Sequence, residues 1–221
     1  MDREPAKWEV RRYKDFLVSK TCKTVGDIRL NTEATPEIVE ALNPDVVIAA
    51  VGSDAIVPDF PGVDREKALT FVDVYSNIEK IGQNVVIVGG ALLGCEAALF
   101  LAQRGKSVTI VEMRDKLGDP TYPHYNVPLV EAIDNNPNIS YRLKTRCIEV
   151  LPNGIRVEKE GVEEAIAADS VVFSVGQTPV LDAVEKLRRC AAEFYSVGDC
   201  VKPQRIMEAT RTGFFSAMNI R

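Results

Sequence analysis

No two of the five cysteines are separated by just two residues, so the sequence contains no C-x-x-C pair. Local zinc sites and iron–sulfur clusters need thiols at such short spacings, and the sequence excludes both. Because the cysteines are odd in number and widely spaced, a reducing, cytoplasmic compartment is favoured over a disulfide framework. We expect all five to be buried free thiols that pack as small apolar side chains.

Other familiar signals are also missing. There is no long uncharged apolar run, which predicts no membrane-spanning helix, and the first residues have no apolar signal core. The net charge of −5 argues against nucleic acid or an anionic membrane as a partner. The single histidine, His124, follows two prolines and is expected on a surface loop. No Ser/His/Asp arrangement or carboxylate pair emerges, so we predict no catalytic side chain and no metal ligand.

The composition, with 46% apolar and 27% charged residues, is sufficient for a sizeable core in one large or two small domains. Apolar strands alternate with helical segments, which is typical of an α/β fold. An antiparallel meander interrupts this alternation at 147–151, 154–159 and 163–167. The other strands are expected at 27–30, 45–52, 84–88, 107–112, 139–142, 170–176 and 193–197. Helices are expected at 7–19, 36–42, 74–79, 92–104, 127–133, 181–188 and 203–219.

The most informative segment is the glycine-rich turn between the strand 84–88 and the helix 92–104. A second apolar strand follows and ends in an acid, Glu112, which completes the layout of a dinucleotide-binding βαβ unit. The free N–H groups and the dipole of the helix N-terminus favour a pyrophosphate at such a turn. The predicted contact residues are Gly89, Gly90, Ala91, Leu92, Leu93 and Gly94.

Three positions of the turn have distinct predicted roles. Gly89 permits the tight turn, and Gly94 lets the helix pack closely against the sheet. Ala91 replaces the second glycine of G-x-G-x-x-G, so its methyl group lies where the backbone should approach phosphate. We therefore expect nucleotide binding to be looser than at an unmodified motif, or shifted.

The acid at the end of the second strand indicates which nucleotide binds. The carboxylate of Glu112 can accept both hydroxyls of the adenosine ribose, and it repels a 2′-phosphate. The sequence therefore predicts NAD(H). Two nearby cations, Arg114 and Lys116, leave NADP(H) open as an alternative.

Two segments on either side of this unit are similar to each other. Residues 45–52 and 169–176 are both short apolar strands that end in glycine, at Gly52 and Gly176, and a proline-bearing loop follows each. They indicate two crossover points between which a domain is inserted. Near the end of the chain, Gly198-Asp199 follows another strand and precedes the last helix.

Together these segments resemble the two-dinucleotide-domain flavoprotein disulfide-reductase superfamily. The resemblance implies that Asp199 hydrogen-bonds the ribityl or phosphate part of FAD, with Gly198 beside it and Gly52 and Gly176 at the crossovers. It implies an NAD(P)H-binding domain over residues 70–177. A partial, discontinuous FAD-binding domain would comprise residues 1–69 and 178–221.

A narrower resemblance covers nearly the whole chain. Residues 28–37, 88–96, 108–113 and 198–201 resemble the C-terminal region of the Old Yellow Enzyme-like NADH:flavin oxidoreductases, which include 2-enoate and 2,4-dienoyl-CoA reductases. In that family a TIM barrel carries FMN and an iron–sulfur cluster, and the matching region passes electrons from NAD(P)H through FAD to the barrel. The lack of a C-x-x-C pair agrees, because electrons must then leave to a centre other than a disulfide.

The chain differs from that family in how much of the flavin domain it contains. The family's flavin domain begins with its own βαβ unit, and nothing before Lys7 supplies one. We therefore expect a fragment that is inactive alone, in which exposed apolar surface makes homodimerisation an alternative. Two other functions stay open. One is an electron-input module of the glutamate synthase or ferredoxin–NADP reductase kind, and the other is a non-catalytic dinucleotide-binding domain.

Overall fold

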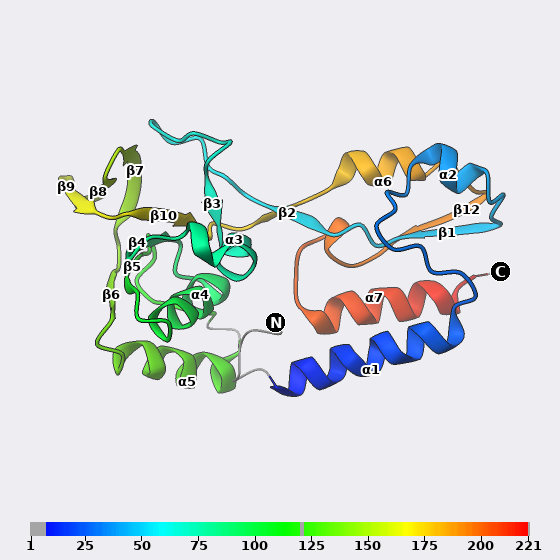
Figure 1. Ribbon diagram of the computed structural model, residues 1–221, viewed down its shortest axis with the longest axis horizontal. Helices are drawn as coiled ribbons and strands as arrows, with labels where there is room; N and C mark the ends of the chain where they lie inside the picture. Colours follow the sequence, from blue (N-terminus) through cyan, green and yellow to red (C-terminus); the bar gives the residue numbers. More distant parts are fainter. Residues whose placement is uncertain (1–7, 120–121, 221) are drawn as a thin grey trace. The chain divides into compact units, whose positions relative to one another are not determined.

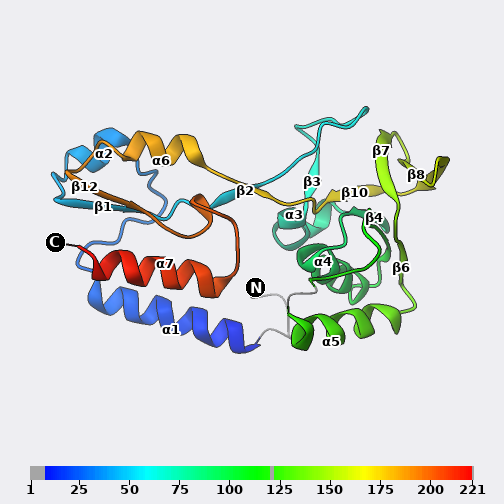
Figure 2. The ribbon, with the colours of Figure 1, turned by 180° about the vertical axis from the view of Figure 1, so that it is seen from behind.

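A computed structural model describes residues 8–119 and 122–220, and it shows an α/β fold with a parallel sheet and an antiparallel meander (Figure 1 and, from behind, Figure 2). The predicted fold class is confirmed. The chain forms two compact units, one over residues 55–176 and the other over the described residues of 4–54 and 177–221. That these units bind NAD(P)H and FAD respectively stays a prediction.

The unit of residues 55–176 is built on a five-stranded sheet in the order β3-β10-β4-β5-β6, and every neighbouring pair is parallel. The residues Val85 to Val88 of the central strand are all buried, because a parallel sheet is covered on both faces. The strands are β3 (Leu69–Thr70), β4 (Asn84–Val88), β5 (Ser107–Val111), β6 (Ile139–Arg142) and β10 (Ser170–Phe173).

Helices cover one face of this sheet and the meander packs on the other. Ile87 and Ile110 point into the helix-side core with Phe100, while Val86 and Val88 point into the meander-side core. This alternation follows from the two-residue period of a strand. The helices are α3 (Phe71–Ser76), η2 (Ile78–Lys80), α4 (Leu92–Ala102) and α5 (Pro123–Asp134). The meander comprises β7 (Arg146–Leu151), β8 (Gly154–Lys159) and β9 (Val162–Ala167).

The second unit has a much smaller core. Its sheet consists of β1 (Val46–Ala49) and β12 (Glu193–Ser196), which pair in parallel. Ala49, Leu187 and Cys190 form its buried cluster. Its helices are α1 (Trp8–Thr24), α2 (Pro36–Glu40), α6 (Leu181–Leu187), η3 (Gly198–Cys200) and α7 (Ile206–Met218), of which α1 and α7 bury no residue.

Two paired segments connect the units. β2 (Ser53–Ala55) pairs with β11 (Gln177–Pro179). The N–H of Val180 donates to the carbonyl of Gly52 at 3.3 Å, and the N–H of Ile56 donates to the carbonyl of Gly176 at 3.0 Å. Both glycines have positive φ, at 78° and 127°, which explains glycine at each position. The chain therefore leaves and re-enters the second unit along one short ribbon.

Several sequence-based expectations about the elements are wrong; among them, the strand expected at 170–176 ends at Phe173 and the helix expected at 74–79 begins at Phe71 and ends at Ser76. Residues 27–30 form no strand, because they pair with no other segment within the described chain, and Ile28 and Leu30 are exposed. The strand at 45–52 ends at Ala49, and Ile48 is 40% exposed because the sheet has just two strands. The helix expected at 127–133 begins at Pro123, where a proline suits the first turn, so His124 lies exposed in that helix and not on the loop that the sequence predicts.

The thiols also differ from expectation in one case. Cys95, Cys147, Cys190 and Cys200 are buried, as predicted, whereas Cys22 is exposed on α1. No residue of that helix is buried, and its thiol is exposed with the rest of it.

No helix within residues 8–119 and 122–220 combines the length and the apolar character that crossing a bilayer requires.

Candidate nucleotide-binding site

The glycine-rich turn lies at the carboxyl edge of the large sheet, between β4 and α4. Gly89 adopts a φ of 106°, and its N–H donates to the carbonyl of Val111 at 2.9 Å. A Cβ atom at Gly89 would lie 2.3 Å from the carbonyl oxygen of Ser174, at the end of the neighbouring strand β10. Both the conformation and the crowding require glycine, in agreement with the tight turn that the sequence predicts.

The first turn of α4 approaches this backbone very closely. A Cβ atom at Gly94 would lie 1.9 Å from the carbonyl oxygen of Gly89. One at Gly90 would lie 2.6 Å from Cδ2 of Leu117. The space for side chains at both positions is therefore taken up by the turn and by the segment after β5.

The N-terminus of α4 has no side-chain cap. Ala91 occupies the N-cap position with φ −71° and ψ −173°, a conformation open to any residue, and it cannot itself donate or accept through its side chain. The first N–H groups of a helix have no intrahelical partner, so those of Leu92 and Leu93 are available for an anion. The substitution of Ala91 for glycine thus causes no strain in the turn.

The side chain of Glu112 lies against the glycine turn. The residue as a whole is 4% exposed, and its Oε2 accepts the N–H of Gly90 at 2.7 Å. Its Oε1 accepts the backbone N–H of Arg114 at 2.8 Å and Nε of the same residue at 3.1 Å. The acid therefore lies beside the turn, as the βαβ pattern predicts, but it already has protein partners.

The charge state of Glu112 follows from these contacts. Burial raises the pKa of this carboxyl group, but the hydrogen bonds from Arg114 and from the Gly90 N–H outweigh that cost. The resulting pKa is lower than the ordinary glutamate value. Glu112 is therefore a carboxylate at neutral pH.

The second unit holds the other predicted group. Gly198-Asp199 directly follow β12 and Val197, while Gly52 follows the parallel neighbour β1. The N–H of Gly198, which has a φ of 69°, donates to Oγ1 of Thr212 at 2.9 Å. Oδ1 of Asp199 accepts the N–H of Gln204 at 3.2 Å. Parallel strands put their carboxyl ends at one edge, so these residues share the edge where ligands of such sheets bind.

The predicted residues thus form two groups. Residues 89–94 and Glu112 meet in the larger unit, and Gly52, Gly198 and Asp199 belong to the smaller one. Gly176 marks the return through the connecting ribbon. A ligand contact for each of them stays a prediction. Two residues that contact the turns were not predicted, namely Ser174 beside Gly89 and Thr212 bonded to Gly198. No local sequence pattern marks either residue.

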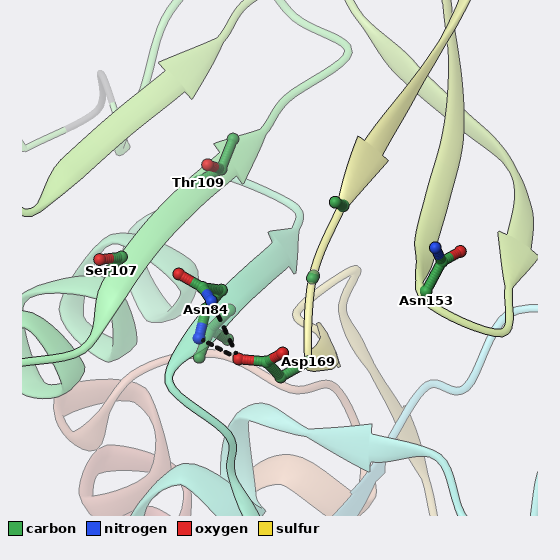
Figure 3. A pocket seen from close by; sticks show the side chains of 8 residues that line it. Asn84, Ser107, Thr109, Asn153 and Asp169 are labelled. Carbon is green, nitrogen blue, oxygen red and sulfur yellow. Dashed lines mark hydrogen bonds between the residues drawn. The ribbon is translucent and has the colours of Figure 1, made fainter.

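A polar hollow lies at the opposite edge of the large sheet (Figure 3). It has a volume of about 410 Å³ and lies at the amino ends of β4 and β5. There Oδ2 of Asp169 accepts the N–H of Asn84 at 2.7 Å and its side-chain Nδ2 at 3.1 Å. These bonds fasten β10 to β4. Because ligands of parallel sheets bind beyond the carboxyl ends of the strands, the hollow is not the nucleotide site.

A parallel sheet with a glycine turn at its carboxyl edge, inserted into a second α/β unit, defines the class of two-dinucleotide-domain flavoprotein reductases. The sequence profile described as pyridine nucleotide-disulphide oxidoreductase matches residues 15–213, and the chain belongs to that family. The family in general binds FAD and NAD(P).

Individual relatives agree with the narrower resemblance. The chain is 32% identical to an NADH oxidase of Thermoanaerobacter brockii, over 98% of this chain and 34% of that protein. It is 32% identical to a cinnamate reductase of Clostridium sporogenes, over 99% of this chain and 32% of that protein. The predicted membership of the enoate-reductase group is confirmed.

A solved structure shows the same fold. A 2-naphthoyl-CoA reductase in complex with 2-naphthoyl-CoA superposes with a TM-score of 0.88 at 24% identity, over 99% of this chain and 33% of that one. The chain therefore spans about a third of the length of the proteins that it matches.

Proposed function

We propose that this chain is the electron-input module of an NADH-dependent flavin oxidoreductase of the enoate-reductase type. Hydride transfer from NADH to FAD is the chemistry that the two cofactors supply. The observation that carries the proposal is the uncapped N-terminus of α4 at a glycine turn, with an ionised acid beside it. The family and the names of the relatives support the same function.

The larger unit would bind the nicotinamide nucleotide. The N–H groups of Leu92, Leu93 and Gly94 would donate to its pyrophosphate, as helix N-termini do. Glu112 would accept a hydroxyl of the adenosine ribose and disfavour a 2′-phosphate, which supports NAD(H) as the preferred nucleotide.

The smaller unit would contribute to FAD binding. Asp199 has one oxygen bonded to the N–H of Gln204, so its other oxygen can accept a ribityl hydroxyl. Gly198 and Gly52 have no side chains that would obstruct a ligand at that edge, and Gly176 holds the ribbon that joins the two sites. Thr212 would position the Gly198 turn through its hydrogen bond.

The electrons would leave to a further centre. Since the relatives are about three times as long as this chain, we propose that a barrel domain with FMN and an iron–sulfur cluster receives them in the full-length protein. The substrate would be reduced at that barrel domain, so this chain alone would be colourless and inactive.

Calorimetric titration of the 221-residue chain with NADH, NADPH and FAD in separate experiments tests the proposal. We expect weak binding of NADH at one site, weaker binding of NADPH, and no tight binding of FAD. An absence of NADH binding would contradict the assignment of the turn, and equal affinity for the two nicotinamide nucleotides would contradict the role of Glu112. Tight, stoichiometric binding of FAD would contradict the expectation that this chain alone is colourless.

A further inference from the structure

The segment after β5 is bonded to the glycine turn at one peptide group. The N–H of Gly118 donates to the carbonyl of Gly90 at 2.8 Å, and Sγ of Cys95 donates to the same oxygen at 3.2 Å. Gly118 is buried, and the side chain of Leu117 beside it lies against Gly90. The carbonyl of Gly90 therefore points toward the segment after β5 and is held in that direction.

The direction of this carbonyl decides where the next N–H points. The Gly90–Ala91 peptide bond is trans, and the C=O and N–H of a trans peptide point in opposite directions. The N–H of Ala91 is therefore directed away from Gly118. It donates no hydrogen bond within the described residues, so it is available, like those of Leu92 and Leu93, to the pyrophosphate of the proposed site.

Asn126, near the start of α5, holds the segment after β5 in place. Its Oδ1 accepts the N–H of Asp119, the residue directly after Gly118, at 2.6 Å. Gly118 has a φ of 75°, and a Cβ atom there would lie 1.7 Å from the same Oδ1. Glycine at this position therefore leaves room for the amide group of Asn126.

The start of α5 is itself fixed to α4. The OH of Tyr125 donates to Oε1 of Glu96, on α4, at 2.6 Å. One turn further along α5, Leu129 is buried in the same apolar cluster as Cys95 and Leu117. Asn126 therefore lies on a helix that is anchored beside the turn, and its amide group has a fixed place from which to hold Asp119.

We propose that Asn126 is a positioning residue of the nucleotide site. Through Asp119 and Gly118 it holds the carbonyl of Gly90, and this carbonyl directs the N–H of Ala91 at the pyrophosphate of the dinucleotide. Asn126 itself touches no part of the nucleotide. The inference rests on the proposed nucleotide site and extends it to a helix that follows the βαβ unit.

The test compares Asn126→Leu with Asn126→Asp in calorimetric titrations of the 221-residue chain with NADH. Leucine has a similar size but cannot accept the N–H of Asp119, whereas aspartate keeps an acceptor at the same place. In Asn126→Leu we expect the Kd for NADH to rise about tenfold, as the loss of one well-directed hydrogen bond to a charged group implies. In about 0.5 M salt, which screens the added charge, the Kd of Asn126→Asp should stay within about threefold of that of the unsubstituted chain.

Asn135→Leu provides the matched control. Asn135 lies at the other end of α5, where its Nδ2 donates to the carbonyl of Glu131 at 2.8 Å. The control thus removes one amide hydrogen bond from the same helix, away from the turn. The Kd for NADH should not change.

Amide hydrogen exchange in the free chain gives a second readout. The N–H of Gly118 is bonded to Gly90, so it should exchange slowly in the unsubstituted chain and in Asn126→Asp. In Asn126→Leu its exchange should accelerate about tenfold or more, while the amides of β4 stay as slow as before. This pattern would locate the effect in the segment after β5 and not in the sheet.

Other results overturn the inference. An unchanged Kd in Asn126→Leu would show that the turn does not depend on Asn126. Equal weakening in Asn126→Asp, loss of folding in both variants, or faster exchange throughout β4 would assign this residue a general role in folding. If the unsubstituted chain binds no NADH, the proposed function fails together with the inference, whereas NADH binding that ignores Asn126→Leu contradicts the inference alone.

Discussion

The N–H of Gly90 donates to Oε2 of Glu112 at 2.7 Å, which joins the glycine turn after β4 to the end of β5. The same segments are joined a second time by the N–H of Gly89, which donates to the carbonyl of Val111. The turn is thereby held in one conformation before any ligand arrives. Because the turn is already ordered, an anion can bind to it without the entropic cost of ordering the backbone.

The close contact between Gly94 and Gly89 makes a sharp prediction for Gly94→Ala. The added methyl group would lie 1.9 Å from the carbonyl of Gly89, so α4 must shift away from the turn. We expect a loss of about 1–3 kcal/mol in the free energy of unfolding, as overpacked sites show, together with loss of NADH binding. Urea unfolding and calorimetry measure the two effects.

A matched control is available in α7. Gly213 also lies within a helix, but a Cβ atom there would meet nothing within 4 Å. Gly213→Ala should stabilise the chain by about 0.5–1 kcal/mol, because alanine loses less backbone entropy on folding, and NADH binding should persist. If Gly94→Ala behaved like this control, the contact at the turn would have no energetic consequence.

The lowered pKa of Glu112 predicts how stability depends on pH. A carboxyl group whose pKa falls on folding stabilises the folded state above its ordinary pKa, about 4.3, and loses that contribution as the pH falls through its folded pKa. Glu112→Gln should therefore lower the free energy of unfolding by about 1–3 kcal/mol at pH 7, because the NH2 group of the amide cannot accept the hydrogen bonds that the second carboxylate oxygen accepts. The difference from the unsubstituted chain should shrink steadily below about pH 4.

Urea unfolding at a series of pH values checks this. Glu79→Gln makes the same chemical change on an exposed residue and should alter stability by less than about 0.5 kcal/mol at every pH. If the loss of unfolding free energy in Glu112→Gln does not vary with pH, the charge of Glu112 contributes nothing to stability.

The thiols should fall into two kinetic classes. Burial raises the pKa of Cys95 to about 12 and that of Cys147 to about 11, and Cys190 and Cys200 are also buried. The thiolate is the reactive form, so these four should resist an aromatic disulfide reagent in the native chain, while the exposed Cys22 reacts. Cys22→Ser should abolish the fast phase, and unfolding should expose all remaining thiols. Rapid reaction of more than one native thiol would contradict the burial of the other four cysteines.

The sequence predicts the central βαβ unit almost to the residue because its signals are local. β4 is a continuous apolar run, the turn is marked by glycines, and α4 ends at Ala102, three residues before Gly105, which adopts a φ of 78°. The strand expected at 27–30 fails for the opposite reason. Its apolar residues favour a strand, but a strand also needs a partner, and no local pattern reveals whether one exists.

The details of the site depend on contacts that are not local. Ser174 crowds Gly89 because β10 lies beside β4 in the sheet, although the two residues are far apart in the chain. The sequence indicates both Glu112 and Arg114, but not that they are bonded, since this depends on their side-chain conformations. Only the folded structure therefore shows that Glu112 is hydrogen-bonded to Arg114.

Amide hydrogen exchange with and without saturating NADH tests the central claim most directly. The N–H groups of Leu92, Leu93 and Gly94 should exchange rapidly in the free chain, since the first N–H groups of a helix have no intrahelical partner, and should become protected when NADH binds. Protection of these three amides is the predicted result. Bound NADH that leaves them unprotected, or that protects only residues around the hollow of Asn84 and Asp169, would contradict a nucleotide site at the glycine turn.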